Sequence, residues 1–220
     1  MGVYEINRDL YSVQLNTINK KYNSISILRL AAIVFFLGSM YFYIKNGETI
    51  FIALAVLFFG IFIVLMRFHS KLVFQKQIKQ ALIEINVNEI AYLKREKNPF
   101  ENGVEFNDFN HPYAYDLDIF GEHSLFQNLN RTATFIGKKT LANQLLTLLP
   151  NEAINRNHKA VQELSEKIDW RQEFLAFAKI SNDNQTSYKT LLQWNRFNST
   201  PLSKTSIWIS YMLPDRKSVV

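Results

Sequence analysis

Two long apolar runs near the N-terminus constrain this chain more than any other feature of its sequence. Residues 25–44 contain one charged side chain, Arg29, and residues 49–66 contain none. At a rise of about 1.5 Å per residue, each run forms a helix roughly 27–30 Å long, which matches the hydrocarbon thickness of a bilayer. Neither run has a polar face, whereas a helix in a globular protein normally has one. We therefore expect two membrane-spanning helices rather than two core helices of a soluble protein.

The residues around these runs predict how the helices cross the membrane. The four residues Lys45-Asn46-Gly47-Glu48 separate them, and Asn-Gly is a turn dipeptide, so the helices should form a tight hairpin. A signal peptide has a shorter apolar region of about 7–15 residues and no second run behind it. Basic residues collect on the cytoplasmic side of a membrane, so we expect both ends of the hairpin to be cytoplasmic. The residues that set this topology are Lys20, Lys21, Arg29, Arg67 and Lys71.

The charge distribution argues against a basic nucleic-acid-binding domain. The net charge is +6 and the sequence pI is about 9.4. Residues 1–96 hold 11 Lys+Arg against 6 Asp+Glu, whereas residues 97–200 hold 11 against 12. The positive excess therefore lies mostly beside the membrane, where it can touch anionic lipid. The absence of cysteine excludes disulfide scaffolds, thiolate zinc sites and cysteine nucleophiles.

The rest of the chain predicts an all-α fold. Spacings of three and four residues between apolar side chains indicate a juxtamembrane helix over 70–96, which we interpret as a stalk rather than a coiled-coil seam. Turn residues follow over 97–110, with a short strand expected at Val104–Phe106. The same spacing predicts helices over about 123–130, 135–149 and 157–176, with Thr132 or Thr134 as the cap of the second and a link over 151–157. Leu125, Phe126 and Leu129 share a face of the first helix. The inward residues of the other two are expected to be Leu141, Leu145, Leu148, Leu149, Val161, Leu164, Ile168 and Phe174, and Trp170 and Trp194 are also expected in the core.

Composition and spacing supply no complete catalytic set. Asp116 and Asp118 have the spacing of metal ligands on an extended segment, but no further ligands lie near them, so we favour hydrogen bonds that pin a loop to a helix start. The segment Gly137-Lys138-Lys139-Thr140 lacks the first glycine of a phosphate-binding loop and continues a helical pattern, so we do not assign it to nucleotide. The four histidines show no spacing of a zinc site or a catalytic base. We assign no catalytic residue, metal ligand or cofactor-binding residue in this chain.

The segment from Tyr115 to Phe177 resembles the start of the core domain of the MutS family of DNA mismatch-repair ATPases and their relatives. The resemblance rests on several short motifs in the right order, namely Asp118-Ile119-Phe120-Gly121, Ser124-Leu125-Phe126, Leu129-Asn130-Arg131-Thr132-x-Thr134, Gly137-Lys138-x-x-Leu141, Leu149-Pro150, Ile154-x-Arg156 and Ala160-Val161-x-Glu163-Leu164. In that family the Asn-Arg-Thr-x-Thr-x-x-Gly stretch opens one core helix, and the later motif lies on the next. The motif residues, to which we give a structural role, are Asp116, Asp118, Ser124, Leu125, Asn130, Arg131, Thr132, Thr134, Gly137, Arg156, Glu163 and Leu164.

This resemblance implies a function for a longer protein. A membrane hairpin stands where the family has a mismatch-reading domain, which is similar to a membrane-anchored bacterial branch and implies the bacterial cytoplasmic (inner) membrane. The family's ATPase domain would follow the core, so ATP and Mg are expected for the full-length protein, with possible DNA binding and a homodimer formed through that domain. The alternative is a membrane scaffold or adaptor whose cytoplasmic helices bind a protein partner.

The resemblance and the spans together divide the chain into segments. The expected segments are a cytoplasmic segment at 1–24, the hairpin at 25–66, the juxtamembrane helix at 67–96, a partial MutS-like core at 97–205, the start of a possible third span at 206–214, and 215–220. The last six residues can be encoded by the common sequencing-adapter sequence GATCGGAAGAGCGTCGTG. We therefore expect 215–220 to be non-native read-through and the chain to be an N-terminal fragment.

Overall fold

The computed structural model describes residues 2–181 and 183–196, and every regular element in them is helical. The predicted all-α class is therefore confirmed for this part of the chain. The chain divides into two compact units, one of residues 9–80 and one of residues 1–8 together with 81–220. The expected third span at 206–214 and the expected read-through at 215–220 lie outside the described residues.

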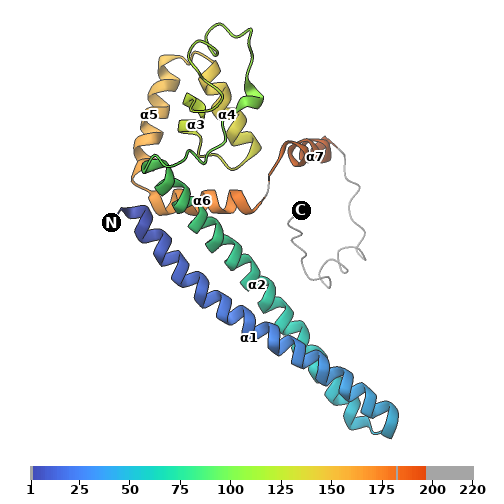
Figure 1. Cartoon of the computed structure of the whole chain (residues 1–220). Coiled ribbons are helices and arrows are strands. Elements are labelled where there is room, and N and C mark those ends of the chain that lie inside the picture. The colour runs from blue at the N-terminus through green and yellow to red at the C-terminus, as the bar shows by residue number, and fades with distance from the viewer. Residues whose placement is uncertain (1, 182, 197–220) are drawn as a thin grey trace. The chain divides into compact units, whose positions relative to one another are not determined.

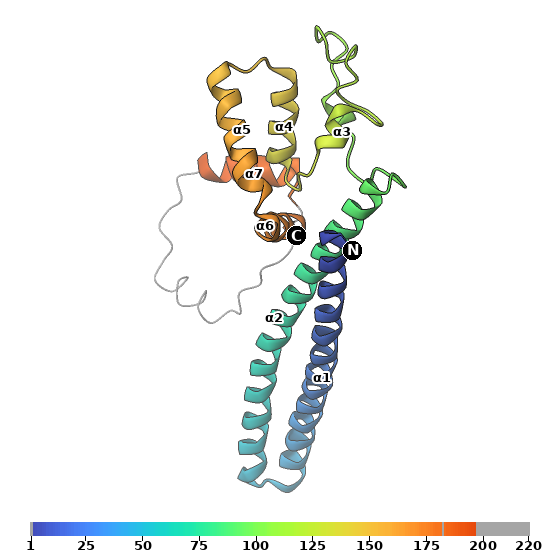
Figure 2. The ribbon, with the colours of Figure 1, turned by 90° about the vertical axis from the view of Figure 1, so that its left-hand side faces the viewer.

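The unit of residues 9–80 is a hairpin of two helices, which lie side by side in both ribbon views (Figures 1 and 2). Helix α1 (Val3–Asn46) is followed by Gly47, whose φ of 71° suits glycine, and helix α2 (Thr49–Leu93) begins two residues after it. Ring pairs such as Phe35–Phe58, with centroids 5.1 Å apart, join the helices along their apolar parts. The predicted helices and the turn between them are confirmed, although both helices extend well beyond the apolar runs.

Both helices contain a segment that is long and apolar enough to span a membrane. Only 11% and 6% of the residues in these segments are buried inside the chain. The core helix of a soluble protein would be mostly buried, whereas the described residues leave most of the apolar surface of these two segments uncovered.

In the other unit, a cluster of three buried amide side chains joins residues that are far apart in the sequence. Asn86 of α2 is fully buried and exchanges two hydrogen bonds with Gln172 of α6 (Ile168–Ile180), with N–O distances of 3.0 and 2.9 Å. The amide of Asn7 donates a third, longer bond of 3.4 Å to the Gln172 carbonyl oxygen. Leu82, Ile85 and Ala176 are buried in the same unit. The cluster satisfies its polar atoms within an apolar core.

We expect Gln172→Leu to weaken this packing by about 1–3 kcal/mol, because the buried side-chain oxygen of Asn86 then loses its donor, while the Asn86 amide still donates to the Leu82 carbonyl oxygen. Amide hydrogen exchange of α6 in the full chain, held in detergent micelles, measures the opening free energy. The double variant Asn86→Leu/Gln172→Leu should recover part of the loss, and Gln162→Leu on the exposed face of α5 is the matched control. Equal exchange in Gln172→Leu and the control would contradict this assignment.

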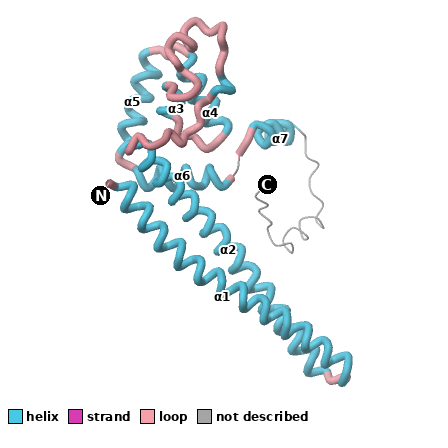
Figure 3. The backbone as a smooth tube through the Cα atoms, viewed as in Figure 1, coloured by secondary structure: helices cyan, strands magenta, loops and turns pink. Residues whose placement is uncertain are grey.

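Short helices and loops make up the remainder of this unit, and loops predominate between α2 and α3 (Figure 3). Helix α3 (Leu125–Leu129) confirms the helix expected at 123–130, but of its expected shared face only Phe126 is buried. The strand expected at Val104–Phe106 is wrong, since these residues form a 3-10 turn, η1. The turn forms because Gly103 has a φ of 67° and its carbonyl oxygen accepts a hydrogen bond from the Phe106 N–H at 2.9 Å.

The boundaries of the later helices correct the sequence prediction. Helix α4 (Phe135–Leu146) ends three residues before the expected limit, where Thr147 becomes extended, and Leu148 is 88% exposed rather than inward. The expected link at 151–157 is instead the start of α5 (Asn151–Ser165), because Pro150 has a φ suited to a helix start and its carbonyl oxygen accepts the first helical hydrogen bonds.

The single helix expected over 157–176 is also wrong, since it is interrupted between α5 and α6. Lys167 leaves the helical region there, with φ −97° and ψ 56°. No glycine or proline marks the break in the sequence. After the break, α6 buries Gln172 and Ala176 against the rest of the unit. Helix α7 (Gln185–Arg196) follows. The expected core positions Val161, Trp170, Phe174 and Trp194 are wrong in the described structure, where these side chains are 54–72% exposed.

Candidate functional site

Two motif residues cap helices. The Ser124 hydroxyl accepts a hydrogen bond from the Gln127 N–H at 3.2 Å at the start of α3. Thr134 accepts one from the Gly137 N–H at 3.1 Å at the start of α4, which confirms Thr134 rather than Thr132 as the cap. A Cβ on Gly137 would lie 2.9 Å from the Thr134 hydroxyl oxygen, so this position favours glycine.

Buried polar side chains of α3 and of Asn130, the residue that follows it, hold the segment 98–103. The Gln127 amide donates to the Phe100 carbonyl oxygen at 2.9 Å, and the Asn130 amide donates to the Glu101 carbonyl oxygen at 3.1 Å. The Asn130 side-chain oxygen also accepts from the N–H and the hydroxyl of Thr132. The bonds from Gln127 and Asn130 satisfy the carbonyl groups of Phe100 and Glu101 in a segment that has no secondary structure of its own.

Arg131 joins this segment to α2. Its guanidinium forms a two-bond ion pair with Glu89, with N–O distances of 2.6 and 3.2 Å. It lies 3.5 Å from the ring centroid of Phe100 and 4.8 Å from that of Tyr92, and it donates to the carbonyl oxygens of Asn128 and Asn130. We call Arg131, Glu89, Tyr92 and Phe100 the arginine clamp. Its geometry indicates a structural joint, because nearly every donor of the guanidinium is used inside the chain.

A polar cleft of about 400 Å³ lies beside the arginine clamp. Most of its charged walls are paired, since Lys179 contacts Glu84 at 2.8 Å and Asp183 accepts a hydrogen bond from the Phe135 N–H at 3.0 Å. The described residues contain no group of three His, Asp or Glu side chains placed to hold a metal. The cleft therefore has the polarity of a small binding site. Its lining comes from α2, the segment 99–101, residues 130–133, α6 and Asp183.

The structure gathers some predicted residues at this cleft and leaves others away from it. Asn130, Arg131 and Thr132 line the cleft. Asp116 and Asp118 are exposed in a turn, where the Asp118 carbonyl oxygen, not its side chain, accepts a hydrogen bond from the Leu125 N–H at 3.1 Å. On α5, Arg156 is exposed, Leu164 is half-buried, and Glu163 pairs with Lys167, whose hydrogen bond and charge hold the pKa of Glu163 below its usual range.

Comparison of the chain with family models, with curated proteins and with solved structures finds no match.

Several residues that organise this unit carry no motif. Asn86 lies within the apolar pattern of α2 next to Ile85, and a polar residue on a buried face is a signal for a specific partner. Glu89 and Gln127 gave no such signal, because their partners come from other elements of the fold.

Proposed function

We propose that this chain is the membrane-anchoring, N-terminal part of a MutS-like protein of the bacterial cytoplasmic membrane. In the proposal the hairpin crosses the membrane twice and the α3–α7 region is cytoplasmic. The full-length protein would be an ATP-dependent, DNA-binding ATPase related to mismatch repair. ATP and Mg would bind to its ATPase domain, which would also supply the homodimer contacts.

The observation that carries the proposal is the placement of the motif residues on successive helices. The stretch Asn130–Gly137 opens α4 with Thr134 as its cap, and the residues Arg156 to Leu164 lie on the next helix, α5. The resemblance implies this order of a capped helix followed by a second helix. Two polar residues of the motif, Asn130 and Arg131, hold the segment 98–103 and join it to α2. These contacts explain their presence by a structural role.

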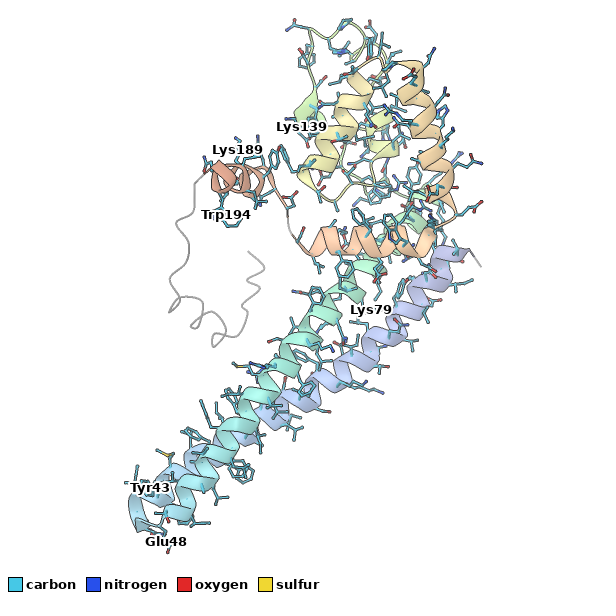
Figure 4. The ribbon with its side chains drawn as sticks, turned by 180° about the vertical axis from the view of Figure 1, so that it is seen from behind. Tyr43, Glu48, Lys79, Lys139, Lys189 and Trp194 are labelled. Atoms are coloured by element: carbon cyan, nitrogen blue, oxygen red, sulfur yellow. The ribbon has the colours of Figure 1, made fainter. Side chains whose placement is uncertain are left out.

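The charge at the two ends of the hairpin supports the proposed orientation. In the unit of residues 9–80, Tyr43 and Glu48 lie near the turn and Lys79 lies toward the opposite end (Figure 4). Lys45 and Glu48 balance each other at the turn, whereas basic residues predominate at the other end. The side with the basic residues is expected to be cytoplasmic.

The absence of cysteine allows a direct test of this topology. Asn46→Cys places a thiol at the turn, and Ser165→Cys places one at the exposed end of α5. In intact spheroplasts, a membrane-impermeant maleimide should label Asn46→Cys and should label Ser165→Cys only after lysis. The opposite pattern would contradict the proposed orientation. A chain that stays in the supernatant after ultracentrifugation without detergent would contradict the anchor itself.

The ATPase is tested separately from the anchor. The uninterrupted gene should encode a Gly-x-x-x-x-Gly-Lys-Ser/Thr loop within a few hundred codons after codon 213, and purified residues 1–214 should show no ATP turnover. A stop codon, an unrelated domain or turnover by the fragment would contradict the proposal.

A second candidate is a membrane adaptor that binds a protein partner. The observation in its favour is an aromatic pair on α6, where Trp170 and Phe174 stack with centroids 5.4 Å apart although they are 54% and 63% exposed. The same gene sequence discriminates between the candidates, since an adaptor needs no phosphate-binding loop.

A further inference from the structure

A strongly basic region flanks the apolar parts of the hairpin on one side. Residues 9–29 and 67–80 contain Asp9 as their single acidic residue. We call the basic residues of these two segments the basic collar. They are Lys20, Lys21, Arg29, Arg67, Lys71, Lys76 and Lys79, and all belong to the unit of residues 9–80. Seven cations against one anion within two helical segments create a strong local positive potential.

In the membrane anchor proposed above, four collar residues lie at the depth of lipid headgroups. Lys20 and Lys21 precede the first apolar run by four or five residues, and Arg67 and Lys71 follow the second by one to five. At about 1.5 Å per residue, they lie roughly 2–8 Å from the hydrocarbon edge, within the headgroup layer. All four side chains are exposed, and in the described part of the chain none of them forms an ion pair.

Two further cations lie above this level and are held in place by aromatic rings. The Lys76 ammonium lies 5.2 Å from the ring centroid of Tyr22, and the Lys79 ammonium lies 4.9 Å from that of Tyr11. A cation over a ring keeps its full charge, so both contribute to the field of the collar. Aromatic and basic side chains together are typical of a membrane interface.

The surroundings of His69, which lies between the basic residues of the collar, disfavour its charged form. Its ring packs on Tyr22, with centroids 4.6 Å apart. Burial, and secondarily the charge of Arg29, hold the pKa of His69 below its usual value. The positive charge of the collar therefore comes from its lysines and arginines.

We propose that the basic collar binds the phosphate groups of anionic phospholipids in the leaflet that surrounds it. The proposal rests on the membrane anchor proposed above and adds the lipid class that the anchor prefers. Anionic leaflets attract basic segments beside a span, and this attraction falls off within a Debye length of about 10 Å. DNA offers the same phosphate chemistry, but the four exposed cations lie at headgroup depth, where a duplex outside the membrane does not reach them.

The test compares lipids at the surface of the inserted protein. The full chain is reconstituted in phosphatidylcholine nanodiscs that contain spin-labelled phosphatidylglycerol or spin-labelled phosphatidylcholine, and electron paramagnetic resonance measures the fraction of each label that is immobilised by the protein. We expect a roughly three- to ten-fold preference for phosphatidylglycerol in 0.1 M salt and a much smaller one in 1 M salt. The variant Lys20→Gln/Lys21→Gln/Arg67→Gln/Lys71→Gln should bring the preference close to one.

The matched control removes the same number of charges from exposed positions outside the collar. It carries Lys139→Gln, Arg156→Gln, Lys159→Gln and Lys189→Gln, of which Lys139 and Lys189 are labelled in Figure 4. It should keep the wild-type preference. An equal preference in the two quadruple variants, or no preference in the wild type, would overturn the proposal.

Two other outcomes overturn it for different reasons. If a fluorescent DNA duplex binds in phosphatidylcholine discs, is lost in the collar variant, and no lipid preference is seen, the collar serves nucleic acid instead. If the chain does not remain with the discs, the membrane anchor itself fails. Stable insertion without any lipid preference leaves the anchor intact and removes only this inference.

Discussion

Phe126→Ala is expected to lower the opening free energy of the α3 region by about 3–5 kcal/mol, the cost typical of removing a large buried aromatic side chain. Phe126 is 0% exposed. Its ring centroid lies 5.4 Å from that of Phe120 and 5.9 Å from that of Phe106, so the substitution leaves a cavity among aromatic rings. Amide hydrogen exchange of residues 98–103 and of α3, in the full chain in detergent micelles, measures the effect.

A neighbouring leucine supplies the control for this substitution. Leu129 lies on the same short helix but is 52% exposed, so Leu129→Ala should cost less than about 1 kcal/mol. The backbone near Phe126 is equally constrained, because a Cβ on Gly103 would lie 2.6 Å from the Phe126 ring. A loss below about 1 kcal/mol for Phe126→Ala would mean that this aromatic cluster does not organise the unit.

Arg131→Ala is expected to cost about 2–4 kcal/mol, since it leaves the half-buried Glu89 carboxylate without its partner and uncovers the rings of Phe100 and Tyr92. The side chains of Arg131 and Glu89 are 30% and 15% exposed, so the pair is only partly screened by water. Arg131→Lys should recover little, because lysine cannot form the two-bond pair and stack on Phe100 at once. The readout is hydrogen exchange of residues 98–103 and of the α3–α4 junction.

A control substitution and a double-mutant cycle test the prediction for Arg131. Arg156→Ala removes an exposed arginine from α5 and should change the opening free energy by less than about 0.5 kcal/mol. In a double-mutant cycle, Glu89→Gln and Arg131→Ala should be clearly non-additive, because the two side chains form one ion pair. Additive losses would show that the arginine clamp is not a coupled unit.

The motif residues show how far local sequence determines a candidate site. Ser124 and Thr134 could be expected as caps, because a hydroxyl before an apolar helical pattern is a local signal. The contacts of Arg131 could not be predicted in this way, since Glu89 is 42 residues away in the sequence and Phe100 belongs to a segment without regular structure. Nothing in the sequence near Arg131 distinguishes a structural joint from a surface charge.

The sequence by itself determined the hairpin, because the hydropathy of 25–44 and 49–66 and the turn chemistry of Asn46-Gly47 are local properties of the chain. Only the tertiary structure decided the pairing of Asn86 with Gln172, 86 residues apart, and the break at Lys167 that directs α6 toward it. The physical reason is that a buried amide is stable only when a distant partner satisfies it, and a helix without glycine or proline is interrupted only when the packing gained exceeds the cost of the break.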